Sequence, residues 1–238
     1  LDKMSKKLKS PFRHEYIFKM AADQTSKKDY EKAIKTYQSI LSDKPTDRME
    51  KMVKNAIAQI RQESLHIVSE VVVPSNQNFL VNVTHRNIDK ACFKIVKVEN
   101  IEINDLLRNN TADQIKMIEK LPIVREWDRT DIKNGYDFNN YEEIVDGLDY
   151  GQYLLVASNE SDYKGVNAAY IYSAFHVSDL AFKSYQRPDG QLINVRDRST
   201  GKPVDNATIK TYYNEYDRNQ RKQIRKHLKN YKTDKNGN

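Results

Sequence analysis

The sequence predicts an α+β protein in which an N-terminal α-helical segment is followed by antiparallel β-sandwich domains. Three observations support this fold class. Apolar residues recur at helical spacing through residues 12–60, the spacing changes to the alternation typical of β-strands near Glu63, and turn residues separate the later apolar runs. The 238 residues suffice for one large domain or for two to three small ones.

About three amphipathic helices are expected in residues 1–65. Ser10 and Pro11 offer an N-cap and a first-turn proline for the first helix. The segment Ser26–Asp29 resembles a capping box for the second, and either Thr46 or Asp47 would cap the third. The apolar positions of the second helix have offsets 0, 3, 4, 7 and 11, and they are Tyr30, Ala33, Ile34, Tyr37 and Leu41.

Short strands with turn-rich connections follow the helices, as in a β-sandwich rather than in βαβ units. The clearest are Val71–Val73, Asn78–His85, Ala91–Val98, Val124–Trp127, Tyr141–Val145 and Ala168–Val177, and the segment Gly147–Ser158 contains a turn followed by a further strand. The single Trp127 is expected to fill the sandwich core. Residues Leu106–Lys120 fit either a short helix, with Ile115 and Ile118 facing inward, or a long surface crossing.

A β-hairpin is expected in Leu192–Tyr213. Gly201 can take a positive φ, and Pro203 belongs in the connection or at a strand edge because it cannot donate to a sheet. The basic segment 215–230 that follows has two interpretations. The spacing of Ile224 and Leu228 permits a helix, whereas the family resemblance described below favours a long hairpin.

Composition limits the function classes. The net charge of +7 is concentrated in residues 1–60 and 215–238, which fits solvated Lys-rich faces or a surface for acidic partners. The lone Cys92 lies in a strand-like run, so we expect a buried thiol without a disulfide or a Cys-rich zinc site. No nucleotide-binding loop or catalytic motif is recognisable, and Glu142 and Glu143 would point to opposite faces of a strand. We therefore expect no catalytic, metal-binding or cofactor-binding residues.

The histidines also lack the spacing of a metal or catalytic site. His85 and His176 are predicted at strand ends, where they could meet in space, but strand-end histidines are more often surface residues than ligands. A surface position is therefore expected for both.

Two stretches together resemble the macroglobulin-type, immunoglobulin- or fibronectin-like domains of the alpha-2-macroglobulin family. One is the hairpin string Val195–Ile209, with Thr-Gly-Lys-Pro-Val at its centre, and the other is Thr233–Gly237. Gly147–Tyr153 resembles a turn of the same family, in which Gly151 would supply the turn conformation and Tyr153 a buried ring. The structural-motif residues that this resemblance implies are Gly147, Gly151, Tyr153, Thr200, Gly201, Lys202, Pro203, Val204, Ala207, Thr233, Asp234 and Gly237.

The resemblance divides the chain into three parts. Residues 1–65 would form a helical cap, residues 66–178 one macroglobulin-like sandwich, and residues 179–238 a second, truncated sandwich. The first two helices also resemble a single tetratricopeptide-like pair, although Ala21 stands where that motif usually has Gly. One repeat cannot form a peptide-binding solenoid, so a structural cap is expected.

The resemblance implies a non-catalytic scaffold fragment of a bacterial envelope protein that traps peptidases. Its partners would be other macroglobulin domains of the same chain and target peptidases, with any membrane contact made through an anchor elsewhere. Localisation in the periplasm or on the cell surface is implied by the resemblance. The thioester motif of many family members is not present at Cys92, which is followed by Phe93 and Lys94.

Two alternatives remain open. A carbohydrate- or protein-binding module of a cell-surface protein could use Tyr212, Tyr213 and Tyr216 as an aromatic platform for sugars. A binder of nucleic acid or of another acidic surface could use the basic 215–235 region, although no recognised nucleic-acid module accompanies the charge.

Overall fold

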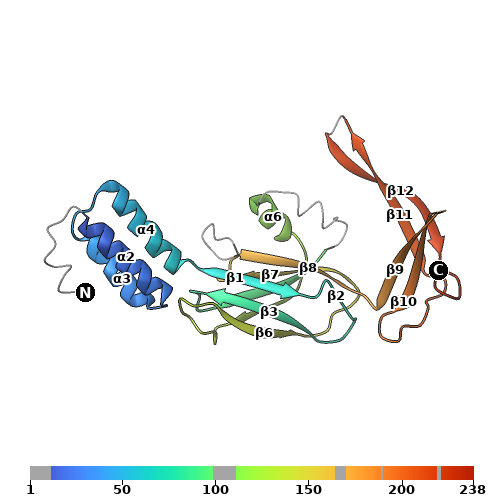
Figure 1. Cartoon of the computed structure of the whole chain (residues 1–238). Helices are drawn as coiled ribbons and strands as arrows, with labels where there is room; N and C mark the ends of the chain where they lie inside the picture. Colours follow the sequence, from blue (N-terminus) through green and yellow to red (C-terminus); the bar gives the residue numbers. More distant parts are fainter. Residues whose placement is uncertain (1–11, 99–110, 164–169, 189, 219–220) are drawn as a thin grey trace. The chain divides into compact units, whose positions relative to one another are not determined.

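The computed structural model describes residues 12–98, 111–163, 170–188, 190–218 and 221–238. Helices at the N-terminal end are followed by a mostly antiparallel β-sandwich, so the predicted α+β class is confirmed (Figure 1). Contacts group the chain into two compact units. The first comprises Leu1–Ser69, Leu80–Ile144 and Tyr153–Ala174, and the second Glu70–Phe79, Val145–Gln152 and Phe175–Asn238. None of the described helices is long and apolar enough to cross a bilayer.

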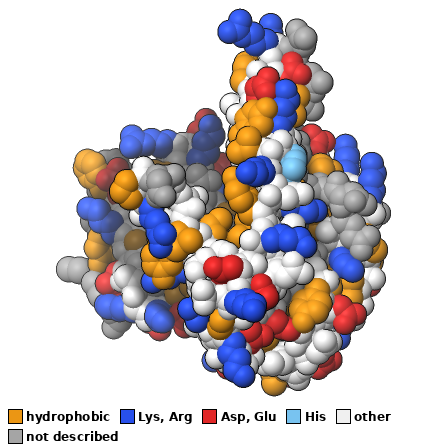
Figure 2. All heavy atoms as spheres, turned by 90° about the vertical axis from the view of Figure 1, so that its right-hand side faces the viewer, with side chains coloured by type: hydrophobic (Ala, Val, Ile, Leu, Met, Phe, Trp, Pro, Cys, Tyr) orange, Lys and Arg blue, Asp and Glu red, His pale blue; other side chains and the backbone are white. Residues whose placement is uncertain are grey.

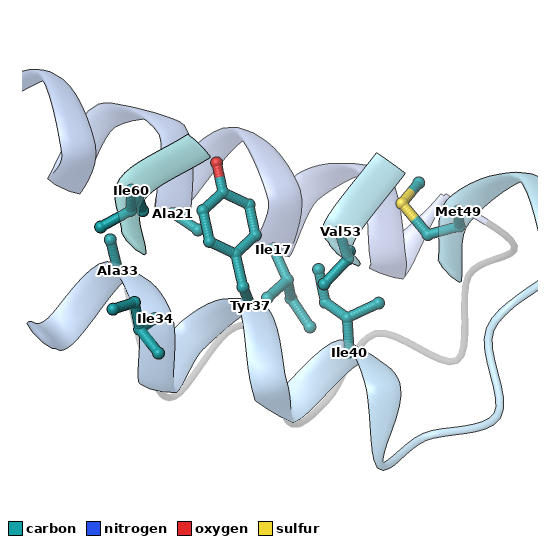
Figure 3. Close-up of a cluster of buried hydrophobic side chains, with 9 residues drawn as sticks. All are labelled: Ile17, Ala21, Ala33, Ile34, Tyr37, Ile40, Met49, Val53 and Ile60. Atoms are coloured by element: carbon teal, nitrogen blue, oxygen red, sulfur yellow. The ribbon is translucent and has the colours of Figure 1, made fainter. Parts of the chain in front are cut away.

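Three helices open the first unit: α2 (Arg13–Ser26), α3 (Tyr30–Leu41) and α4 (Asp47–Arg61). The apolar positions spaced three and four apart converge on one core, which Figure 3 shows in close-up. Its buried members are Ile17, Ala21, Ala33, Ile34, Tyr37, Ile40, Met49, Val53 and Ile60. The amphipathic pattern of residues 12–60 therefore identified the helices and their buried faces.

Of the predicted helix caps, the structure confirms the one at Thr46 and contradicts the one at Ser26. Thr46 is the N-cap of α4, and its hydroxyl accepts the backbone N–H of Met49 at 3.4 Å. The capping box at Ser26 is wrong, because Ser26 is the last residue of α2 and Asp29 makes no side-chain cap bond to α3. Lys28, between them, has φ +63°, so the chain turns where the box would have started the second helix. The predicted Ser10–Pro11 cap lies outside the described residues.

One face of the sandwich is a three-stranded sheet in the order β1 (Ser64–Ser69), β3 (Phe79–Arg86) and β6 (Asn139–Val145). β1 pairs antiparallel with β3, with Leu65 opposite His85. Strand structure begins at Ser64, inside the predicted helical part, because α4 ends at Arg61. β3 buries every second residue, including Val81 and Val83, as its alternating sequence predicts.

The other sheet has five strands in the order β2-β8-β7-β4-β5. Their bounds are β2 (Val72–Val73), β4 (Ala91–Lys97), β5 (Ile123–Arg129), β7 (Gly151–Ser158) and β8 (Tyr170–Val177). The β2–β8 pair is parallel and is an exception to the antiparallel pattern. β4 and β7 are central strands and carry long buried runs.

The short-helix interpretation of Leu106–Lys120 is confirmed for its described residues, which form α6 (Thr111–Ile118). Ile118 is buried under this helix in a cluster with Cys92, Leu154 and Tyr163, whereas Ile115 is only half-buried. The start of the predicted segment, residues 106–110, lies outside the described residues.

The described residues between Leu180 and Lys232 form two hairpins. β9 (Leu180–Arg187) pairs with β10 (Gly190–Asp197), and β11 (Thr208–Asp217) pairs with β12 (Lys222–Lys232). The second hairpin is seen as two long ribbons in Figure 1. Of the two interpretations of 215–230, the hairpin is confirmed and the helix is wrong, because Lys222–Lys232 is a strand along its whole length.

Candidate functional site

The Thr-Gly-Lys-Pro turn is built around the carboxylate of Asp197, at the end of β10. Its Oδ1 accepts the backbone N–H groups of Thr200 (2.8 Å) and Ser199 (3.1 Å), and both hydroxyls donate to the same oxygen. The side-chain and backbone hydrogen bonds from Thr200, followed by those from Ser199, lower the pKa of Asp197 to about 2. Gly201 has φ +69° and donates its N–H to the Asp197 carbonyl at 2.9 Å.

The structure brings the two ends of the predicted motif together at Thr233. The Thr233 hydroxyl donates to the Val204 carbonyl at 2.6 Å and accepts the Ala207 N–H at 2.8 Å. The backbones of Thr233 and Ala207 are also joined by a 3.0 Å bond. Thr233 is only 4% exposed, so one side chain satisfies two backbone groups in a largely dry setting. We call this set of bonds the Thr233 clasp.

Gly237 places the chain directly against β10. Its carbonyl accepts the Val195 N–H at 2.7 Å, and Val204 donates back to the Val195 carbonyl at 3.1 Å. With φ +80°, a Cβ at Gly237 would lie 2.3 Å from the Val195 oxygen. Asp234 closes the same turn by accepting the N–H groups of Asn236 and Asn238, and these bonds, that of Asn238 foremost, lower its pKa.

Lys202 and Pro203 complete the turn by returning the chain to β10. Asp197 donates its N–H to the Lys202 carbonyl at 2.9 Å, and Pro203 forms an isolated bridge with Arg196. Pro203 therefore lies in the connection, as its missing N–H requires.

Gly147, the first residue of the Gly147–Tyr153 string, lies close to the backbone of Asn76 in the same unit. A Cβ at Gly147 would lie 2.4 Å from the Asn76 carbonyl carbon, so this position has room for glycine alone. Tyr153 is 2% exposed. Gly151, however, begins β7, and among the described residues the glycines with positive φ are at positions 190, 201 and 237, so the expected turn conformation is not found at Gly151.

Sequence reasoning missed Asp179, a carboxylate of the second unit that lies between β8 and β9. Its Oδ1 accepts the Ser75 N–H at 2.8 Å, and its Oδ2 accepts the hydroxyls of Tyr150 (2.6 Å) and Ser75 (2.7 Å). Its carbonyl accepts the Arg198 N–H at 2.7 Å. These bonds, that of Tyr150 foremost, lower the pKa of Asp179. We call this set the Asp179 junction.

In the first unit, the side chains of Trp127 and Arg129 on β5 bind Glu143 on β6 and so link the two sheets. Trp127 is half-buried, because β5 is an edge strand, so the prediction that it fills the core is wrong. Its ring stacks on fully buried Phe93, with centroids 5.2 Å apart, and its Nε1 donates to Glu143 at 3.1 Å. Arg129 Nε donates to the other Glu143 oxygen at 2.8 Å. The 5%-exposed Glu143 thus connects β5 to β6, while neighbouring Glu142 is exposed.

Cysteine and histidine show no grouping that would support catalysis within the described residues. Cys92 is fully buried as predicted, and burial raises the pKa of its thiol to about 11, which disfavours the reactive thiolate. The described part of the chain contains no group of three or more His, Cys, Asp or Glu residues placed to hold a metal. The expected surface position of His85 is wrong: it is 2% exposed and packs on Tyr141, while His176 is half-buried in register with Val72.

The basic hairpin β11–β12 exposes both cations and tyrosines. Figure 2 shows Lys and Arg side chains in blue next to hydrophobic side chains in orange on this hairpin. Because side chains alternate along a strand, Tyr212 and Tyr216 share one face while Tyr213 lies on the other, so the three do not form a single platform. The Arg225 guanidinium lies 4.1 Å from the Tyr212 ring centroid, and Lys226 pairs with Glu215 at 2.7 Å. Part of the charge is therefore engaged within the hairpin itself.

Comparisons with known proteins show a shared fold. No protein-family model matches the sequence, and a search of curated proteins found no match. Among solved structures, native alpha-2-macroglobulin from Escherichia coli spanning domains NIE-MG1 matches with TM-score 0.50 and 14% identity, covering 74% of this chain and 85% of that one. A fragment of the same protein spanning MG0-NIE-MG1 matches with TM-score 0.48 and 13% identity. This second match covers 74% of this chain, which spans 56% of that fragment. The likeness to the NIE-MG1 fragment supports a macroglobulin-like fold.

Proposed function

We propose that this chain is a non-catalytic scaffold module of a bacterial, extracytoplasmic alpha-2-macroglobulin-like protein, and that it contributes to peptidase trapping by the full-length protein. The module would comprise a helical cap (1–65) with a tetratricopeptide-like first pair, one sandwich (66–178) and part of a second (179–238). Its partners would be further macroglobulin domains of the same chain and target peptidases.

One observation carries the proposal. The polar side chains of the family-like strings bind the chain's own backbone: Asp197 shapes its turn, Thr233 joins two segments, and Asp234 closes the last turn. These side chains position strands, which is the work of a scaffold. The macroglobulin-like fold supports the same conclusion.

The experiment compares two substrates of one endopeptidase in the presence of the full-length protein. Trapping encloses the peptidase without blocking its active site, so we expect cleavage of fluorescent casein to fall while cleavage of a short chromogenic peptide continues. The isolated chain should inhibit neither reaction. Serine, cysteine and metallo-endopeptidases are tested in turn.

A matched pair of variants links the result to this module. Asp179→Ala removes the carboxylate of the Asp179 junction and should weaken the protection of casein, whereas Asp205→Ala changes an exposed carboxylate and should not. The proposal is refuted if the full-length protein leaves casein cleavage unchanged with every peptidase, or if it blocks both substrates equally.

A further inference from the structure

A polar cavity of about 390 Å³ lies in the first unit, where β3 and β5 end and β6 begins. His85 is the penultimate residue of β3, Arg129 the last of β5, and Asn139 the first of β6. Tyr141, two residues along β6, and the 131–133 loop complete the lining. A volume above 300 Å³ is within the range of small-ligand sites.

Two groups in this lining are buried without a hydrogen-bond partner among the described residues. They are Nδ1 of His85, whose residue is 2% exposed, and the hydroxyl of Tyr141. The two rings meet edge to face with centroids 5.7 Å apart. Buried polar groups in folded proteins nearly always have a partner, which suggests that these two find theirs in whatever fills the cavity.

The surrounding side chains are held in place by bonds outside the cavity. Glu143 fixes Arg129 through the 2.8 Å bond to Nε, and Asp137 accepts the Asn139 amide at 2.9 Å through its carbonyl. Asn140 accepts the Thr84 hydroxyl at 2.6 Å. The lining is therefore pre-organised, which lowers the entropy cost of binding.

The charges around the cavity do not favour an anion. Arg129 and Lys133 are balanced by the lining carboxylates Asp131 and Glu142, and Glu143 forms an ion pair with Arg129. Burial lowers the pKa of His85, so its imidazole is neutral at pH 7. The lining thus offers amide, guanidinium, imidazole and phenol groups without a net positive charge.

We propose that this cavity binds a neutral polyhydroxylated ligand the size of one sugar residue. A hydroxyl both donates and accepts, so it can pair with Tyr141 and with Nδ1 of His85 in either tautomer. The Asn139 amide and the Arg129 guanidinium, both in the lining, add planar groups for neighbouring hydroxyls. This site is independent of the scaffold role and of the exposed tyrosines of β11–β12.

The test uses the whole chain, ¹⁵N-labelled, titrated with methyl glucoside, methyl galactoside, N-acetylglucosamine and glucuronate. Glucuronate differs from glucose by a carboxylate and therefore probes the charge argument. We expect at least one neutral sugar to give saturable amide shifts confined to His85 and residues 129–142, with glucuronate binding more weakly.

Tyr141→Phe removes one buried hydroxyl and should raise the Kd about fivefold or more, whereas Tyr150→Phe, outside the cavity, should leave it unchanged. If Tyr141→Phe fails to fold by circular dichroism, Asn139→Ala serves in its place with the same expectation. The proposal is overturned if no neutral sugar gives saturable shifts up to about 50 mM, if glucuronate binds more tightly than every neutral sugar, or if the cavity variant binds like wild type.

Discussion

Thr233→Val tests whether the Thr233 clasp holds the C-terminal segment. Valine has nearly the same shape as threonine but lacks the hydroxyl, so the Val204 carbonyl and the Ala207 N–H both lose their partner. A buried polar group left unpaired costs about 1–3 kcal/mol, and two of them at a 4%-exposed residue predict a loss of about 2–4 kcal/mol. Thr233→Ser keeps the hydroxyl and should lose less than about 1 kcal/mol, for one methyl group.

Hydrogen exchange measures this loss locally. The Asn206 and Thr233 amides donate to the carbonyls of Thr233 and Ala207, which the substitution leaves in place. Because about 1.4 kcal/mol corresponds to a factor of ten, their protection should fall roughly 30- to 1000-fold in the valine variant and less than about tenfold in the serine variant. Equal protection in the two variants would refute the role assigned to the hydroxyl, since they differ in that group.

Three further predictions follow from local geometry. Gly147→Ala should lower the free energy of unfolding by about 2–3 kcal/mol in urea titrations, because the new Cβ would lie 2.4 Å from backbone atoms. The control Gly135→Ala, whose Cβ would have nothing within 4 Å, should be near neutral. Similar losses in the two variants would contradict the close packing at Gly147. Thr46→Ala should lower the free energy of unfolding by about 1 kcal/mol and Asp29→Ala by less than about 0.5 kcal/mol, because of these two residues only Thr46 makes a side-chain cap bond. A larger loss for Asp29→Ala than for Thr46→Ala would support the predicted capping box instead. The carboxyl ¹³C signal of Asp197 should titrate near pH 2. Because this folded-state pKa is depressed, the contribution of Asp197 to stability is present above about pH 4 and is lost as the pH falls toward 2. A titration midpoint near pH 4 would show that the turn bonds are absent.

The spacing of apolar residues predicted the elements whose structure depends on residues close together in the sequence. The spacing of Tyr30, Ala33 and Tyr37 predicted a helix together with its buried face, and the alternation of residues 78–85 predicted β3. The capping box failed because Ser26–Asp29 has a composition that also suits a chain reversal, and the left-handed Lys28 made the reversal. Composition alone does not distinguish these two outcomes.

Features that depend on distant partners could not be predicted. Glu143 was considered only beside Glu142, yet its partners Trp127 and Arg129 come from another strand. Asp179 was not singled out from the sequence, although Ser75 binds it from 104 residues away. The one signal available for Asp197 was local, an Asp followed by Ser and Thr two and three residues later, which is typical of side-chain-capped turns.

The Asp179 junction also bears on how the chain would survive among peptidases. Only Ser178 and Asp179 separate β8 from β9, and a protease must draw a longer extended segment into its active site than these two residues provide. Opening the connection would require breaking the bonds of Asp179 to Ser75, Tyr150 and Arg198 together. We therefore expect the Ser178–Asp179 connection to resist proteolysis, although exposed connections between strands are common cleavage sites. Its cleavage should follow unfolding rather than precede it.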